Sequence, residues 1–171
     1  MLGNENKFLI IMRHANAIKY NPALSDFQRD LTEQGIHQAN LSANFLANYP
    51  HFIPQLIISS SAKRALHTAE IVADKLNLPY NIIDIKDTLY SGDLNTYIDT
   101  IYQVDDEISR LMILGHNPSI SMLSYLLTNK EVNKMKITGP ELNLGVINCM
   151  KGCTRYQSEI LSCYAEESAS C

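Results

Sequence analysis

No apolar run in this 171-residue sequence approaches the length of a membrane-spanning helix, which needs about 20 apolar residues. The N-terminal apolar stretch ends at Met12, where Arg13 and His14 follow. That stretch is too short for a secretory signal, and no small-residue cleavage site follows it. We therefore expect a cytoplasmic protein without a membrane partner.

Common signatures of nucleotide and zinc chemistry are also missing. The sequence contains no GxxxxGK(S/T) phosphate loop, no GxGxxG fingerprint, no HExxH helix and no GxSxG elbow. The cysteines, Cys149, Cys153, Cys163 and Cys171, lie near the C-terminus without a CxxC pair. Reduced thiols are therefore favoured over a zinc site, and we expect neither a metal nor a cofactor.

An excess of basic residues is absent as well. The net charge is -4, which argues against a general nucleic-acid binder but permits a small cationic pocket. Hydrophobic residues make up 46% and charged residues 19%, as in ordinary globular proteins. The length predicts a single domain over residues 1–171, with loose ends at about 1–6 and 165–171. We expect a monomer.

Apolar runs of strand length alternate with helical patterns along the chain. The predicted strands are 7–12, 55–59, 80–85 near an edge, 110–114, 145–150 and 158–163. The predicted helices are 33–48, 62–76, 94–104 and 120–127. This alternation predicts an α/β fold, a three-layer αβα sandwich with a mostly parallel central sheet.

Residues at the helix starts and on the first helical face give more detailed expectations. Thr32 is a good N-cap for the first helix, and Ser60 or Ser61 for the second. The first helix places four apolar residues broadly on one side. These are Ile36, Leu41, Phe45 and Leu46.

Residues with reactive or charged side chains follow three of the predicted strands. Arg13 and His14 follow the first strand, Arg64 lies just beyond the second, and His116 and Asn117 follow the strand 110–114. Ligands of open parallel sheets bind outside the carboxyl ends of the strands, so neighbouring strands would bring these residues together. Guanidinium groups match phosphate oxygens. The pattern therefore predicts a pocket for a phosphoryl group.

Each of these residues also has a simpler explanation. A single histidine after a strand is more often structural than catalytic, and Arg64 could be a solvated helical residue. An unpaired arginine beside a buried strand, as at Arg13, would be costly. The coincidence at three strand ends favours a functional site. We expect the remaining histidines, His37, His51 and His67, to be ordinary surface residues, with His67 at most behind the pocket, one turn from Arg64.

Four segments, taken together, resemble the histidine phosphatase superfamily. They are MRHA at 12–15, RDLTEQG at 29–35, SSSAKRALHTAE at 59–70 and LGHNP at 114–118. They resemble the family's RHG, R-P-L-T-x-x-G, S-S-P-x-x-R-A-x-x-T-A-E and G-H-N-P motifs, in the same order and spacing. The departures are Ala15 and Ser119 where glycine is frequent, and Asp30 and Ser61 where proline is common. The short form, with no inserted cap, is similar to the bacterial phosphohistidine phosphatases of the SixA type.

The resemblance implies a phosphoglycerate mutase-like fold and a metal-independent phosphatase. It makes His14 the nucleophile, which would carry the phosphoryl group as phosphohistidine. Arg13, Arg64, His116 and Asn117 would bind the phosphoryl oxygens. The implied partner is a phosphorylated histidine-containing phosphotransfer protein of signal transduction. We also expect Arg13 and Arg64 to keep His14 neutral, and a backbone carbonyl to hold its other ring nitrogen.

The resemblance does not identify the general acid that would protonate the leaving group. Larger relatives use a Glu or Asp from an inserted segment, and here Asp26, Asp30 and Asp93 are the candidates by loop position. Each is otherwise a solvated loop carboxylate. Phosphoramidates are more labile than alkyl phosphates, so a site without a dedicated acid would suit phosphohistidine. The alternatives are a broad small-molecule phosphomonoesterase, or an interaction module that binds phosphate without turnover. A phosphoglycerate mutase is less favoured, because those relatives are longer.

Overall fold

A central twisted sheet organises the computed structural model, which describes residues 7–128, 142–150, 153–156 and 161–163. Its strands run in the order β3-β2-β4-β1-β5-β6, and β7 pairs with β5. Their bounds are β1 Lys7–Arg13, β2 Leu56–Ser60, β3 Ile83–Lys86, β4 Arg110–Gly115, β5 Leu142–Met150, β6 Cys153–Tyr156 and β7 Leu161–Cys163. The first four strands are parallel, whereas β5 runs antiparallel to β1, β6 and β7. The mostly parallel sheet is confirmed.

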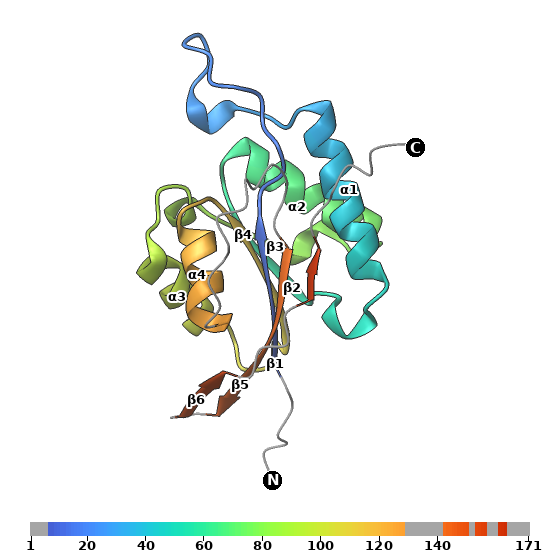
Figure 1. The fold of residues 1–171 in the computed structure, drawn as a ribbon, viewed down its shortest axis with the longest axis vertical. Coiled ribbons are helices and arrows are strands. Elements are labelled where there is room, and N and C mark those ends of the chain that lie inside the picture. Colours follow the sequence, from blue (N-terminus) through green and yellow to red (C-terminus); the bar gives the residue numbers. More distant parts are fainter. Residues whose placement is uncertain (1–6, 129–141, 151–152, 157–160, 164–171) are drawn as a thin grey trace.

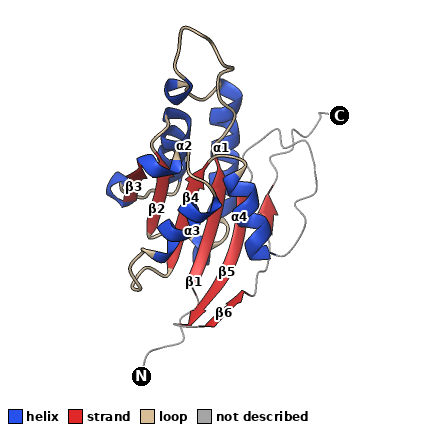
Figure 2. Ribbon diagram, turned by 90° about the vertical axis from the view of Figure 1, so that its left-hand side faces the viewer, coloured by secondary structure: helices blue, strands red, loops and turns tan. Residues whose placement is uncertain are grey.

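Two pairs of helices cover the two faces of this sheet. The helices are α1 Glu33–Ala47, α2 Lys63–Lys75, α3 Leu94–Tyr102 and α4 Ser119–Thr128. Helices α1 and α2 lie on one side, α3 and α4 on the other (Figures 1 and 2). Alternate side chains of β1 point to opposite faces, so Ile10 joins one apolar cluster and Leu9 the other. The three-layer αβα architecture predicted from the sequence is confirmed.

Helix α1 begins as predicted but buries a different face. The Oγ1 atom of its N-cap, Thr32, accepts the backbone N–H of Gly35 (3.0 Å). Of the predicted apolar face, Leu46 is buried, whereas Ile36 and Leu41 are 38% and 37% exposed. The buried face consists mainly of small or polar side chains, at Gly35, Gln38, Ala39, Ser42, Ala43 and Leu46.

Close packing explains this choice of face. A Cβ atom at Gly35 would overlap the backbone carbonyl oxygen of Asn16, in the loop that follows β1. Ala39 and Ala43 are fully buried on the same side. Small side chains let the helix approach its neighbours closely, and a hydrophobicity pattern alone misses such a face because it gives weight to large apolar residues.

Some predicted boundaries differ from the structure. The N-cap of α2 is Ala62, which has no side-chain cap, so the expectation of Ser60 or Ser61 is wrong. Ser60 is the last residue of β2, and its hydroxyl accepts the Ala62 N–H (3.3 Å). Residues 80–82 form a 3-10 turn, and β3 at the sheet edge begins only at Ile83.

Parts of the sequence-based prediction fall outside the described residues. These parts are the two chain ends and residues 158–160 of the last predicted strand, while β7 covers its remainder. Within the described ranges, no helix has both the length and the apolar character for a membrane crossing. The same ranges contain no group of three or more His, Cys, Asp or Glu side chains placed to hold a metal ion.

Candidate active site

The carboxyl ends of β1, β4 and β2 lie side by side and carry the predicted pocket residues. Arg13 is in register with Gly115, the residue before His116. The rings of His14 and His116 come within 5.0 Å, measured between centroids. Arg64, the second residue of α2, is only 5% exposed, and its Nε–H donates to His14 Nε2 (3.3 Å). The predicted convergence of His14, Arg64 and His116 is therefore present in the structure.

Both ring nitrogens of His14 have partners that define one neutral tautomer. Nδ1 lies 2.7 Å from the carbonyl oxygen of Ala15, which can only accept, so Nδ1 carries the proton. Nε2 faces the N–H of Arg64, so it presents a lone pair. We assign this tautomer from the hydrogen-bond partners. The expected backbone carbonyl is thus that of Ala15, and Nε2 is the nitrogen that carries the lone pair.

The surroundings of His14 favour its neutral form. Burial is the largest cause that lowers its pKa from 6.5 to about 4, and the positive charges of Arg64, Arg13 and Arg29 add to it, against the Ala15 hydrogen bond. The two arginines expected from the sequence therefore contribute, but burial contributes more. At neutral pH Nε2 of His14 is therefore unprotonated and keeps its lone pair.

The second histidine, His116, is held by a serine hydroxyl. Its pKa is lowered from 6.5 to about 3, mainly by burial and in addition by the neighbouring His14 and Arg64. Its Nε2 lies 2.8 Å from Ser60 Oγ, which already accepts the Ala62 N–H. A hydroxyl can donate one hydrogen bond and accept two, so this contact fits either neutral tautomer of His116. In the tautomer that accepts from Ser60, the buried Nδ1 carries the hydrogen, and among the described residues it has no hydrogen-bond partner. In that tautomer the Nδ1–H can donate to an oxyanion.

We expect acid to destabilise the protein through these two buried histidines. In the folded protein their pKa values are about 4 and about 3, below the ordinary 6.5. Between pH 6.5 and pH 4 the unfolded chain therefore binds more protons than the folded protein does. Stability should fall as the pH drops from 6.5 towards 4, by ~1.4 kcal/mol per pH unit for each histidine. Urea unfolding at a series of pH values measures this slope. The variant His116→Asn should reduce the slope, and an unchanged slope would contradict the assignment.

Asp26 connects the arginines of the pocket. It lies in a single 3-10 turn, Asp26–Gln28, in the loop between β1 and α1. One carboxylate oxygen accepts Arg29 Nε (2.8 Å) and pairs with its Nη2 (2.7 Å). The other accepts Arg64 Nη2 (2.9 Å) and the Tyr90 hydroxyl (2.9 Å), and the backbone oxygen of Asp26 accepts Arg64 Nη1 (2.6 Å). A carboxylate offers about four acceptor sites, and all of them are in use.

These contacts determine the protonation state of Asp26. Burial acts to raise its pKa, but hydrogen bonds from Tyr90, Arg29 and Arg64 outweigh burial and bring the pKa to about 2. The group is ionised at neutral pH. It therefore has no proton to donate there, which argues against it as the general acid, and its role in this arrangement is to orient Arg29 and Arg64.

Asp30, the second acid candidate, ties the same loop to α2. Its Oδ1 lies 2.6 Å from His67 Nδ1, and its Oδ2 lies 3.0 Å from Lys63 Nζ. Burial acts to raise the Asp30 pKa, but the hydrogen bonds from His67, Lys63 and the Leu31 N–H lower it overall. His67 thus has a defined acidic partner in Asp30. The sequence had predicted an ordinary surface residue at this position.

Two further predicted residues have local partners instead. Asp93, the third acid candidate, is the N-cap of α3, where its Oδ1 accepts the backbone N–H and hydroxyl of Thr96 (both 2.9 Å). The exposed Asn117 accepts a hydrogen bond from Ser121 Oγ in the first turn of α4 (2.8 Å). Phosphate binding by Asn117 stays a prediction.

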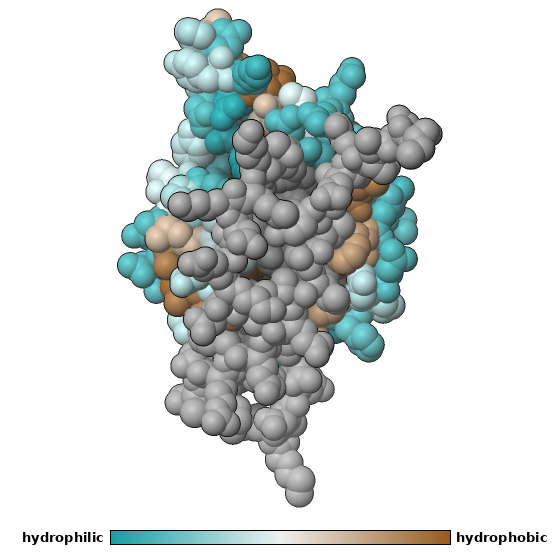
Figure 3. Space-filling view, viewed as in Figure 1, coloured by the Kyte–Doolittle hydropathy of each residue, from teal (hydrophilic) through white to brown (hydrophobic). Residues whose placement is uncertain are grey.

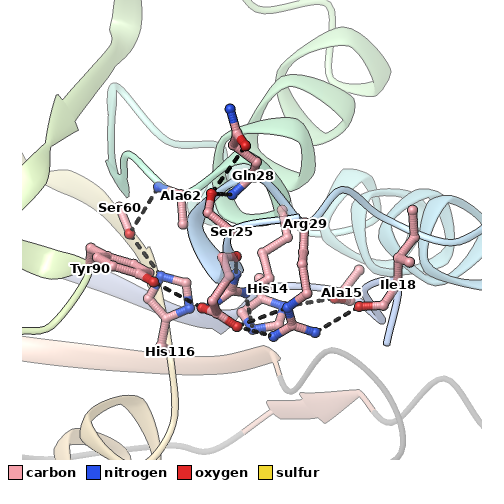
Figure 4. A network of polar contacts seen from close by, with 12 residues as sticks. His14, Ala15, Ile18, Ser25, Gln28, Arg29, Ser60, Ala62, Tyr90 and His116 are labelled. Carbon is pink, nitrogen blue, oxygen red and sulfur yellow. Dashed lines mark hydrogen bonds and ion pairs between the residues drawn. The ribbon is translucent and has the colours of Figure 1, made fainter. Parts of the chain in front are cut away.

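Three residues of the pocket had no predicted role there. Arg29 donates to Asp26 and to the Ile18 carbonyl (2.7 Å). Its position in the family-like RDLTEQG segment could have indicated a role in the pocket. Ser60 was interpreted as a helix cap within the SSSAKRALHTAE segment, without a role toward His116. Tyr90 follows a 3-10 turn after β3, and its sequence context gave no signal. Figure 4 shows Tyr90 beside His116, with Ser60 and Arg29 in the same network.

Comparison with known proteins identifies the family. The family model described as "Histidine phosphatase superfamily (branch 1)" matches residues 9–97. The chain belongs to the histidine phosphatase superfamily. This histidine phosphatase is 30% identical over 119 residues to the uncharacterized protein Rv1276c of Mycobacterium tuberculosis, a match that covers 69% of this chain and 70% of that one. A second family model, "Cys-rich protein, family", matches residues 124–171, less than a third of the chain.

Two of the proteins to which the chain is similar are named as phosphatases of phosphorylated histidine. Escherichia coli phosphohistidine phosphatase SixA is 29% identical over 131 residues, with 76% of this chain and 80% of SixA covered. A structure of the protein histidine phosphatase SixA complexed with tungstate has 25% identity and a TM-score of 0.70, and covers 82% of this chain and 88% of that one. The family membership that the sequence motifs predicted is confirmed, and the protein is an enzyme of the phosphatase class.

The variant Gly115→Ala is expected to destabilise the histidine phosphatase by about 1–3 kcal/mol, because the new Cβ would overlap the Tyr97 hydroxyl. This buried hydroxyl donates to the Leu89 carbonyl (3.0 Å) and accepts the backbone N–H of His116 (3.1 Å). Chemical denaturation measures the loss. In the double variant with Tyr97→Phe the two losses should be less than additive. Full additivity would mean that the two positions do not clash.

Proposed function

We propose that this histidine phosphatase removes the phosphoryl group from phosphohistidine on a phosphotransfer protein and carries it transiently on His14. The observation that carries the proposal is the state of His14: Nδ1–H is held by the Ala15 carbonyl, and the Nε2 lone pair lies among arginines. Simple anion binding requires no such nucleophile. The similarity to SixA, named a phosphohistidine phosphatase, supports the same substrate class.

In the first step, Nε2 of His14 attacks the phosphorus and forms a new N–P bond. The N–P bond of the substrate breaks, its electron pair stays on the leaving imidazole nitrogen, and that nitrogen takes a proton from solvent. Three N–H groups of Arg64 contact His14 and Asp26, and a guanidinium has further donors. These donors, Arg13 and the Nδ1–H of His116 would stabilise the charge on the phosphoryl oxygens.

In the second step, water attacks the phosphorus of phospho-His14. The His14–phosphorus bond breaks, its electron pair returns to Nε2, and the water proton leaves with phosphate or to solvent. The Ala15 carbonyl holds Nδ1–H in both steps. The imidazole therefore ends in the tautomer in which it began.

The ionisation of the nearby carboxylates favours a phosphoramidate substrate over an alkyl phosphate. Asp26 and Asp30 both have lowered pKa values, so neither carries a proton at neutral pH. An alkoxide leaving group needs a proton from an acid, whereas an imidazole leaves more readily. This contrast favours phosphohistidine over the alternative of a broad phosphomonoesterase.

The test compares three substrates at matched concentrations: a phosphorylated phosphotransfer domain, a phosphoserine peptide and a sugar phosphate. We expect rapid dephosphorylation of the first and slow turnover of the others. Quenching during turnover should trap an acid-labile, base-stable phosphoryl group on the protein. Comparable turnover of all three would favour the broad phosphomonoesterase. Phosphate binding without turnover would favour the interaction module.

A further inference from the structure

A continuous series of aromatic rings extends from His14 towards the surface. His116 lies next to His14, and Tyr90 meets His116 edge to face, with 5.8 Å between ring centroids. Phe27 in turn meets Tyr90 edge to face at 5.1 Å. The outermost ring, Phe27, is 38% exposed. The series therefore forms a wall that begins at the nucleophile and ends at solvent.

The neighbours of Phe27 and Tyr90 keep this wall in place. Asp26 precedes Phe27, and its carboxylate accepts the Tyr90 hydroxyl (2.9 Å). The same carboxylate pairs with Arg64, whose guanidinium carbon lies 6.0 Å from the centre of the Tyr90 ring. This network fixes Tyr90 relative to the arginine that faces His14, and Phe27 packs against Tyr90 beside it.

The outer end of this wall is the more exposed one, so it lies on the side from which a substrate can enter. In an in-line transfer the leaving atom lies on the side of the phosphorus opposite the nucleophile. His14 and Arg64 lie at the inner end, whereas the Asp26 side chain is 41% exposed and Phe27 38%. In the space-filling view, an apolar patch lies among hydrophilic side chains at the upper end of the molecule, where Figure 1 places the loop between β1 and α1 (Figure 3). A leaving group on the exposed side of the pocket would lie near the rings of Tyr90 and Phe27, which contact one another and continue the series from His116.

We propose that Phe27 and Tyr90 form a leaving-group subsite that binds the flat ring of a phosphorylated imidazole. Aromatic faces and edges favour a planar ring over a small or branched aliphatic group. The proposal rests on the proposed function, and it deepens that function because it assigns recognition of the ring to residues that take no part in the bond changes.

Two small substrates that share the N–P bond separate recognition of the ring from the chemistry. N-phosphoimidazole releases a ring, and phosphoramidate releases ammonia. We expect Phe27→Ala and Phe27→Leu each to lower kcat/KM for phosphoimidazole about five- to tenfold and to leave kcat/KM for phosphoramidate within about twofold. Phe27→Leu keeps an apolar side chain without a ring. Turnover of phosphoramidate reports in the same sample that the pocket is intact.

The matched control is Tyr20→Ala, which removes a 69% exposed ring from the same loop. It should change neither rate. Equal effects of the Phe27 variants on both substrates, or no effect on either, would overturn the subsite while the proposed function stands. Turnover of a phosphorylated phosphotransfer domain but of neither small substrate would overturn the subsite alone. A wild-type protein that dephosphorylates none of the three would overturn the proposed function, and the subsite with it.

Discussion

Replacement of His14 by asparagine is expected to lower kcat at least about a thousandfold and to abolish the trapped phosphoryl group. The loss should be this large because the variant has no lone-pair nitrogen to replace Nε2, the atom that faces Arg64. Rapid-quench assays with phosphoimidazole and with a phosphorylated histidine-containing phosphotransfer domain measure both quantities. Binding of phosphate should persist through Arg13, Arg64 and His116, and calorimetry can follow it.

The control for this prediction is His37→Asn, the same substitution at an exposed position of α1. It should leave kcat and the trapped phosphoryl group unchanged. If His14→Asn kept turnover within about tenfold of wild type, His14 would not be the nucleophile. Loss of phosphate binding together with turnover would instead point to collapse of the pocket.

The variant Arg64→Lys is expected to lower kcat about a hundred- to a thousandfold although it keeps the positive charge. The guanidinium donates at once to His14 Nε2, to the Asp26 carbonyl and to the Asp26 carboxylate. A lysine ammonium is a compact charge without this planar fork, so it cannot hold the nucleophile, the loop and a phosphoryl oxygen together. Steady-state kinetics should show a larger change in kcat than in KM, because the lost contacts matter most in the transition state.

Arg110→Lys provides the matched control. Arg110 begins β4, so it lies at the opposite end of this strand from His116, and its Nε–H donates to the Ile53 carbonyl (2.8 Å). The substitution is chemically the same but leaves the pocket untouched, and activity should remain that of wild type. A similar loss of kcat in both variants would mean that Arg64 acts through general stability.

The sequence allowed prediction of the residues that the sheet itself positions. His14 and His116 follow apolar strands, and parallel neighbours bring their carboxyl ends together whatever the intervening loops do. The position of Arg64 could be predicted for the same reason, because α2 begins directly after β2. Local pattern and topology were therefore sufficient for these three.

The rest of the pocket depends on a loop without periodicity. Asp26 could be named only as one of three acid candidates, since its contacts with Arg29, Arg64 and Tyr90 join segments far apart in the chain. A sequence pattern contains no information on such pairings. The exposed Ile36 on α1 illustrates a related difficulty, because close packing at Gly35 chose the buried face.

The contact between Arg64 Nε and His14 Nε2 has a consequence for selectivity among electrophiles. A phosphoryl oxygen is a stronger acceptor for a guanidinium than a neutral imidazole nitrogen is. In the proposed mechanism, a substrate that draws the Arg64 N–H to itself would uncover the lone pair that attacks its phosphorus. Electrophiles without an anionic oxygen would meet a nitrogen that is still covered, so substrate capture and activation of His14 would be the same event.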